Sequence, residues 1–158
     1  MKWNRLNGVK VCIIALCLIL SFGIFGCSSI QLIAPYDQKT DAGVTDLQKK
    51  TAEFFTQIER KGGSKPGDYK NHTQFYDDVK VSLSSLVVRS SAISLNTQTT
   101  KELDILTQQY QQLEQDDKKQ GIPQAAVPQY EAAFNRTFTA ILTLEVAKKA
   151  PKAGGTGK

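Results

Sequence analysis

Apolar residues recur at spacings of three and four residues in four separate segments of this chain. The segments cover residues 41–61, 68–95, 99–121 and 125–148. Such spacing places the apolar residues on one face of an α-helix. The four stripes consist of Val44, Leu47, Phe54, Phe55 and Ile58, then Phe75, Val79, Leu83, Leu86, Val87 and Ile93, then Leu103, Leu106, Tyr110 and Leu113, and finally Tyr130, Phe134, Phe138, Ile141, Leu142 and Leu144. The pattern therefore predicts four amphipathic helices.

Local signals predict where these helices begin and end. Thr40 is placed to cap the first helix, and the pair at 62–63, both glycine, ends it. The segment 99–102 (Thr-Thr-Lys-Glu) matches a capping box for the third helix, and Gly121 stops that helix. No window alternates apolar and polar residues as a strand would. Because the links are short, we predict an all-α fold, an antiparallel four-helix bundle, behind a cleaved N-terminal signal helix.

A fifth apolar segment comes before the four helices. Residues 11–25 carry no charge and follow a basic start formed by Lys2, Arg5 and Lys10. Fifteen residues are too few to cross a bilayer core, which needs about 20 helical residues. The segment fits instead the charged and apolar regions of a secretory signal.

Residues 1–29 resemble the signal sequence and lipobox of bacterial lipoproteins. Gly26 is the small residue at the cut, Ile24 fits the aliphatic position, and Phe25 stands where the pattern usually has a small residue. The resemblance implies cleavage between Gly26 and Cys27, with lipid attachment, including acyl chains such as palmitate, at Cys27. The alternative is an uncleaved membrane anchor extended into 30–33, which Ser28 and nearby polar residues disfavour.

The cysteine count agrees with this interpretation. Cys12 and Cys17 lie in the segment to be removed, which leaves Cys27 as the single cysteine of the mature chain. No disulfide and no cysteine metal cluster is therefore expected. The resemblance implies a membrane partner through the lipid anchor, on the exported face of the cell membrane. Because Ser28 is not the aspartate that retains such proteins in the inner membrane, it implies the periplasmic leaflet of the outer membrane in a Gram-negative host.

We predict four regions: a signal peptide at 1–26, a lipidated tether at 27–40, a bundle domain at 41–148 and a flexible basic tail at 149–158. The full chain has a formal charge of +5, but the positive excess lies at its two ends. The bundle is close to neutral, which gives no support for a nucleic-acid partner. The Lys-rich tail is either a solvated end or a weak contact with anionic lipid or wall polymer.

Few residues point to catalysis. His72 is the only histidine, and we interpret it as a surface residue because haem and zinc sites need further ligands at fixed spacing. The pair at 77–78, both aspartate, diverges on a helix, and the aspartates at 116–117 are interpreted as a solvated helix end. No Gly-x-Ser-x-Gly elbow is present. We therefore predict no catalytic, cofactor-binding or metal-binding residues and no cofactor.

One pair of charged residues falls at the edges of two apolar stripes. Arg89 lies beside the second stripe and Glu145 beside the fourth. Because an unpaired charge is costly to desolvate, we predict that these two form a partly buried structural ion pair that fixes helix register.

The expected function is that of a non-enzymatic, lipid-anchored envelope protein whose bundle binds a protein or an envelope component. Two alternatives stay open: a small-molecule sensor or carrier, and a hydrolase of cell wall or glycan. A protein partner predicts an exposed apolar face. A carrier predicts a pocket of at least ~300 Å3 between helices. A hydrolase predicts a cleft holding two carboxylates or a perturbed titratable group.

Overall fold

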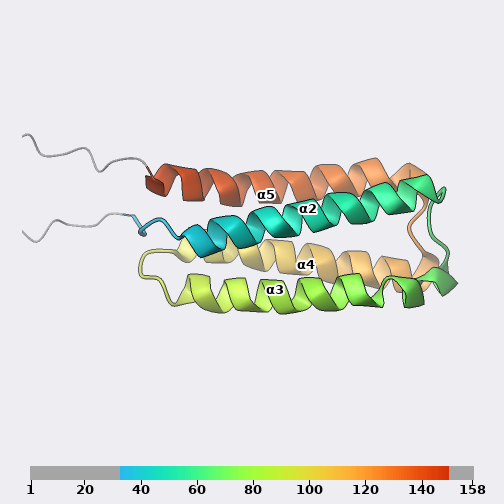
Figure 1. Cartoon of the computed structure of the whole chain (residues 1–158), viewed down its shortest axis with the longest axis horizontal. Coiled ribbons are helices and arrows are strands. Elements are labelled where there is room, and N and C mark those ends of the chain that lie inside the picture. Colours follow the sequence, from blue (N-terminus) through green and yellow to red (C-terminus); the bar gives the residue numbers. More distant parts are fainter. Residues whose placement is uncertain (1–32, 150–158) are drawn as a thin grey trace, which may run out of the picture. The chain divides into compact units, whose positions relative to one another are not determined.

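The computed structural model describes residues 33–149, and they form four long helices packed against one another (Figure 1). The helices are α2 (Gln38–Arg60), α3 (Thr73–Ser91), α4 (Thr97–Gln120) and α5 (Val127–Lys149). Short 3-10 helices, η2 (Pro66–Asn71) and η3 (Gln124–Ala126), lie in two of the connections. The predicted all-α bundle is confirmed. The signal segment and residues 150–158 lie outside the described residues.

Each long helix packs against two neighbours. α5 contacts α2 and α4, and α3 contacts α4 and α2, so the four helices enclose a single core. The chain enters α2 and leaves α5 at the same end of the bundle, as Figure 1 shows. An ion pair of 2.7 Å between Lys149 Nζ and Asp41 Oδ2 joins these two helix ends. We call this the terminal end. The connections 61–72 and 121–126 lie at the opposite end, which we call the far end.

The core is built from the apolar stripes that the sequence predicts. All the stripe residues of α2 and α4 are buried, as are the central ones of α3 and α5. Aromatic rings fill the far half, where Phe54 stacks on Phe75 with centroids 4.1 Å apart and Tyr110 meets Phe134 at 4.6 Å. The Tyr110 hydroxyl shares a hydrogen bond with Thr51, which satisfies both buried groups.

Polar residues continue the apolar stripes at the helix ends. In α4 the buried positions Tyr110 and Leu113 are followed, four residues on, by Asp117, which is fully buried. His72 precedes the α3 stripe in the same way and is only 7% exposed. The interpretation of His72 as a surface residue, and of Asp117 as part of a solvated helix end, is therefore wrong. Both side chains are buried because they hydrogen-bond to each other, with His72 Nδ1 2.7 Å from Asp117 Oδ2.

The helix starts differ from the sequence signals. Asp37, not Thr40, caps α2, because its carboxylate accepts the backbone N–H of Thr40. α4 begins at Thr97, two residues before the predicted capping box, and the Thr99 hydroxyl is used elsewhere. Gly121 ends α4 as predicted, with φ of +76°. A Cβ at this position would lie 2.2 Å from the carbonyl oxygen of Ser64, so the close approach of the two far-end connections requires glycine.

Residues 33–37 pack onto the bundle. Ala34 and Asp37 are buried, and the Tyr36 hydroxyl donates to Asp41 at 2.7 Å. Lys149 Nζ lies 4.5 Å from the centre of the Tyr36 ring, a cation–π contact between this segment and α5. The expected tether at 27–40 therefore includes residues that belong to the folded domain.

Candidate functional site: the groove between α2 and α3

An open groove of about 1340 Å3 runs between α2 and α3. Leu47 and Leu86 lie in its floor, and Val81 and Val88 of α3 line one side. These two valines are 72% and 68% exposed, the largest exposed fractions among the large apolar residues that the structure describes. The α2–α3 groove thus combines an apolar floor with apolar side chains that no other described element covers.

The face of α3 beside the groove is uncharged. No charged residue occurs between Lys80 and Arg89, and the exposed positions within this stretch are Val81, Ser84, Ser85 and Val88. The two valines are seven residues apart, two helical turns, and so lie on one face. Small serines between them would allow a second helix to approach the α3 backbone closely.

The sequence explains why α2 and α3 leave this groove. Gly43 of α2 lies directly under Leu86, and a Cβ at Gly43 would stand 2.8 Å from Leu86 Cδ2. Leu86 therefore seals the core at the groove floor, while the short side chains Ser82, Ser85 and Ala92 line the groove above it. Long apolar residues at these positions would fill the groove.

The rim of the groove is basic. Lys39, Lys49, Lys50, Lys80 and Arg89 line it, against the carboxylates of Asp46 and Glu53, which gives a formal charge of +3. Lys80 and Arg89 are engaged with Glu114 and Asp37. Lys39 and Lys50 have no ion-pair partner within the described residues. The rim is thus suited to an acidic partner.

A second hollow lies on the other side of α3, between α3 and α4. It has a volume of about 400 Å3, and Val79, Leu83, Val87 and Tyr110 form much of its wall. Glu114 is at its edge, where burial favours the neutral acid, but hydrogen bonds from Lys118, Lys80 and Tyr69 outweigh burial and lower the pKa of Glu114 to about 2. A general acid needs a raised pKa, so this carboxyl is unsuited to that role.

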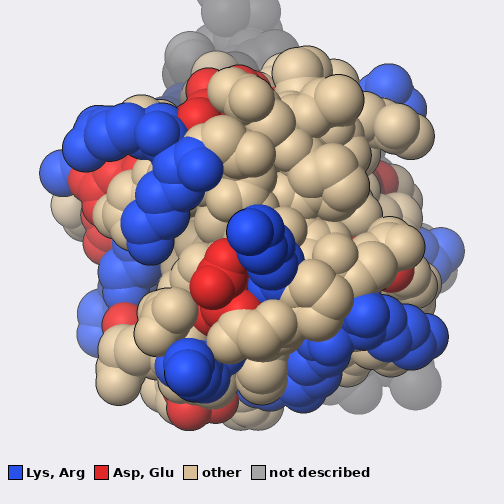
Figure 2. Space-filling model, turned by 90° about the vertical axis from the view of Figure 1, so that its right-hand side faces the viewer, with Lys and Arg blue, Asp and Glu red and all other residues tan. Residues whose placement is uncertain are grey.

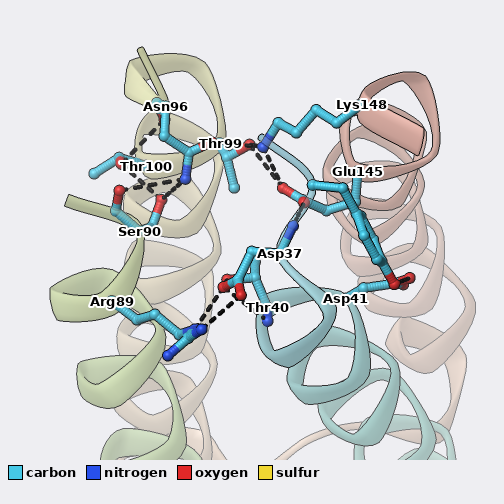
Figure 3. Close-up of polar contacts among 11 residues, drawn as sticks. Asp37, Thr40, Asp41, Arg89, Ser90, Asn96, Thr99, Thr100, Glu145 and Lys148 are labelled. Carbon is cyan, nitrogen blue, oxygen red and sulfur yellow. Dashed lines mark hydrogen bonds and ion pairs between the residues drawn. The ribbon is translucent and has the colours of Figure 1, made fainter. Parts of the chain in front are cut away.

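Arg89 lies at the terminal end, and its partner there is Asp37, not Glu145. Its guanidinium donates two hydrogen bonds to the Asp37 carboxylate, of 2.5 and 2.6 Å, and this bidentate pair appears in Figure 3. The Arg89 guanidinium and the Thr40 cap hold the pKa of Asp37 well below its usual range, although burial opposes the shift. The predicted ion pair between Arg89 and Glu145 is therefore wrong.

Glu145 is fully buried and pairs with Lys148 of its own helix. Its carboxylate also accepts the Thr99 hydroxyl at 3.1 Å and the backbone N–H of Asp37 at 3.4 Å (Figure 3). Arg89 and Glu145 are thus linked only through Asp37. We call the whole cluster the terminal polar network; its members are Asp37, Thr40, Arg89, Ser90, Asn96, Thr99, Thr100, Glu145 and Lys148. Through these members it connects Asp37 to all four long helices.

The predicted lipid-attachment and cleavage residues, Cys27 and Gly26, lie outside the described residues. So does the tail beyond Lys149, which itself is the last residue of α5. Among residues 33–149 no helix is long and apolar enough to cross a membrane. The same residues contain no cluster of three histidine, cysteine or acidic side chains that could hold a metal ion.

Comparison of the chain with protein-family models, with curated proteins and with solved structures gives no match. Proposals about function therefore rest on the residues and the geometry described above.

Proposed function

We propose that this chain is a lipid-anchored, non-enzymatic protein of the bacterial cell envelope that binds another envelope protein through the α2–α3 groove. The observation that carries the binding proposal is the uncharged face of α3, where Val81 and Val88 are exposed beside a long groove. Isolated exposed apolar residues are common, but two on one face beside a groove fit an interaction surface.

The partner that best fits the groove is an amphipathic helix with acidic residues beside its apolar stripe. A helix-in-groove contact uses apolar anchors at intervals of three, four and seven residues. Val81 and Val88 present that interval on α3, and the serines between them leave room for the partner backbone. The unpaired ammonium groups of Lys39 and Lys50 stand at the rim, where they would meet partner carboxylates.

The proposed anchor would keep the bundle close to its membrane. Ala34 is already buried in the domain, so seven residue steps separate it from Cys27. At about 3.3–3.6 Å per residue, that length of chain spans at most ~25 Å. A partner of the groove would thus belong to the same membrane or to the space next to it.

Replacing Cys27 by serine tests the anchor. We expect the wild-type chain to sediment with membranes and to show, by mass spectrometry, a mature N-terminus at Cys27 carrying acyl chains. Cys27→Ser is expected to lose the added lipid mass completely, because serine has no thiol to form the thioether. If the wild-type chain itself keeps its full-length mass without added lipid and stays in membranes, residues 11–33 are an uncleaved anchor and this part of the proposal fails.

Photo-crosslinking in intact envelopes tests the groove. A photoreactive amino acid at position 88 is expected to give a protein adduct, while one at Thr139, exposed on α5 away from the groove, gives none. Adding Val81→Glu should reduce the adduct by at least about tenfold, because it places a charge in the apolar contact. The matched control is Val146→Glu, an exposed valine on α5 that does not line the groove.

The same experiment separates the second candidate function. The 400 Å3 hollow between α3 and α4 is large and apolar enough for a small apolar ligand, which favours a carrier over a hydrolase. A protein adduct at position 88 that survives Val81→Glu would overturn the groove as the contact surface, because Val88 also lines the hollow between α3 and α4. The absence of any adduct, together with an apolar compound retained by the purified chain, would overturn the groove proposal in favour of the carrier.

A further inference from the structure

The far end of the bundle holds a built polar cluster centred on Asp117. This carboxylate is fully buried and accepts hydrogen bonds from His72 Nδ1 at 2.7 Å, Ser64 Oγ at 2.9 Å and the Tyr76 hydroxyl at 3.1 Å. Ser64 also accepts the backbone N–H of Ile122, which joins the two far-end connections. The cluster is therefore held by α3, α4 and both connections.

The geometry fixes which nitrogen of His72 is left for other contacts. A carboxylate only accepts hydrogen bonds, so Nδ1 of His72 must carry a proton. The ring is 7% exposed, and within residues 33–149 its only hydrogen bond is the one through Nδ1. The edge-on contact with the Phe54 ring, at 5.3 Å, holds the imidazole in this orientation. Nε2 thus has no hydrogen-bond partner in the described part of the chain, and unlike Gln109 Oε1 it is not sealed from solvent.

His72 lines a small depression at the surface of the far end, which we call the His72 depression. Its volume is about 220 Å3, and its other walls include Gly62, Gly63, Asn71 and the two lysines at 61 and 65. Asp68 also lines it, but this carboxylate accepts the backbone N–H of Lys65. Figure 2 shows Lys and Arg side chains spread over this end of the molecule.

We propose that the His72 depression binds the carboxylate group of an anionic wall polymer. With both ring nitrogens protonated, His72 keeps Nδ1–H on Asp117 and donates Nε2–H to the ligand carboxylate. The ammonium groups of Lys61 and Lys65 neutralise the ligand charge. A volume of 220 Å3 admits a small acidic group and not a whole sugar chain, so the depression would hold one side group of the polymer.

The choice of a wall polymer over a lipid headgroup rests on the proposed anchor at Cys27. The 23 residues of α2 separate the terminal end from the far end by about 35 Å, at 1.5 Å per residue. The proposed anchor precedes the terminal end in the chain, and the His72 depression lies at the opposite end of the bundle. We therefore assign its ligand to the wall and not to the lipid of the anchoring membrane.

The test is an NMR titration of the isotope-labelled full chain in detergent, with muropeptides released from peptidoglycan as the probe and sodium chloride of equal ionic strength as the blank. We expect saturable shifts at Gly62, Gly63 and the His72 ring. His72→Asn should weaken binding about tenfold or more, because Asn Nδ2 replaces Nδ1 toward Asp117 while Nε2 is removed. A melting temperature close to that of the wild type would show that the fold is kept.

Further variants and probes decide between outcomes. Lys65→Gln should weaken binding severalfold, whereas Lys70→Gln, an exposed lysine of the same end that does not line the depression, should not. The proposal is overturned if no probe gives saturable shifts, or if His72→Asn binds as the wild type does. Tighter binding of glycerol 3-phosphate than of muropeptides would assign the site to a phosphate headgroup and overturn the wall assignment. The groove and the lipid anchor do not enter this measurement.

Discussion

Replacing Glu145 by alanine is expected to lower the free energy of unfolding by about 3–5 kcal/mol, because the change leaves a buried charge without its partner. Glu145 is fully buried, and the ammonium group of Lys148, itself only 8% exposed, donates to its carboxylate. The same carboxylate accepts the Thr99 hydroxyl and the backbone N–H of Asp37. Urea unfolding of the full chain in detergent, followed by far-ultraviolet circular dichroism, measures the loss.

Two further variants separate the charge from general damage to α5. Glu131→Ala makes the same change in the same helix at a partly exposed position with no hydrogen bond within the described residues, and we expect it to cost less than about 0.5 kcal/mol. The double variant Glu145→Met with Lys148→Met removes both charges and should recover most of the loss. If the free energy of unfolding of Glu145→Ala lay within about 1 kcal/mol of the wild-type value, the result would contradict a tightly paired network.

The sequence predicts the helices well because one physical effect sets both the pattern and the packing. Burial of apolar side chains favours a stripe at helical spacing, and Val44, Leu103 and Ile141 occupy such stripes and are fully buried. The same spacing also reaches Glu145, four residues after Ile141. The sequence therefore predicts burial at this position in part, as the edge of a stripe, whereas Glu145 is fully buried.

The partners of these polar residues could not be predicted in the same way. Arg89 and Glu145 lie at the edges of stripes on α3 and α5, and two helices that do not pack against each other cannot bring such edges together. Arg89 pairs instead with Asp37, which precedes the first predicted helix. The sequence does contain a signal for Asp37. Aspartate is a preferred N-cap residue, and its carboxylate can accept the backbone N–H of the residue three positions later, here Thr40. Which basic side chain pairs with Asp37 depends on how each helix is rotated about its own axis. The sequence alone does not specify that rotation.

The α2–α3 groove could be predicted only in part from the sequence. The absence of charge between Lys80 and Arg89 is visible in the chain, as is the spacing of Val81 and Val88 off the buried stripe. That these valines stay uncovered depends on how close α2 comes to α3, which the contact of Gly43 with Leu86 sets. The sequence indicates which helix faces are apolar, but the distances between packed helices decide which of these faces stay exposed to solvent.

Replacing Asp117 by alanine is expected to destabilise the chain by about 3–5 kcal/mol, since it strands several buried donors at once. Asp117 accepts hydrogen bonds from His72, Ser64 and Tyr76, and it is fully buried. Each buried donor left without an acceptor costs about 1–3 kcal/mol. Urea unfolding measures the total. The backbone N–H of Ile122 donates a hydrogen bond to Ser64 Oγ, which links the two far-end connections. Because loss of Asp117 loosens this link, hydrogen exchange at the Ile122 amide should become faster.

The neighbouring residue supplies a matched control. Asp116→Ala removes an aspartate one position away that is partly exposed and accepts from Tyr130 and Gln112, and we expect a loss below about 1 kcal/mol. Tyr76→Phe removes one of the three donors to Asp117 and should cost about 1 kcal/mol. If Asp117→Ala were no more destabilising than Asp116→Ala, the cluster would not hold the far end together. The His72 ring would then lack the support that its proposed contact with an anion requires, because Asp117 is what orients Nδ1 and leaves Nε2 free.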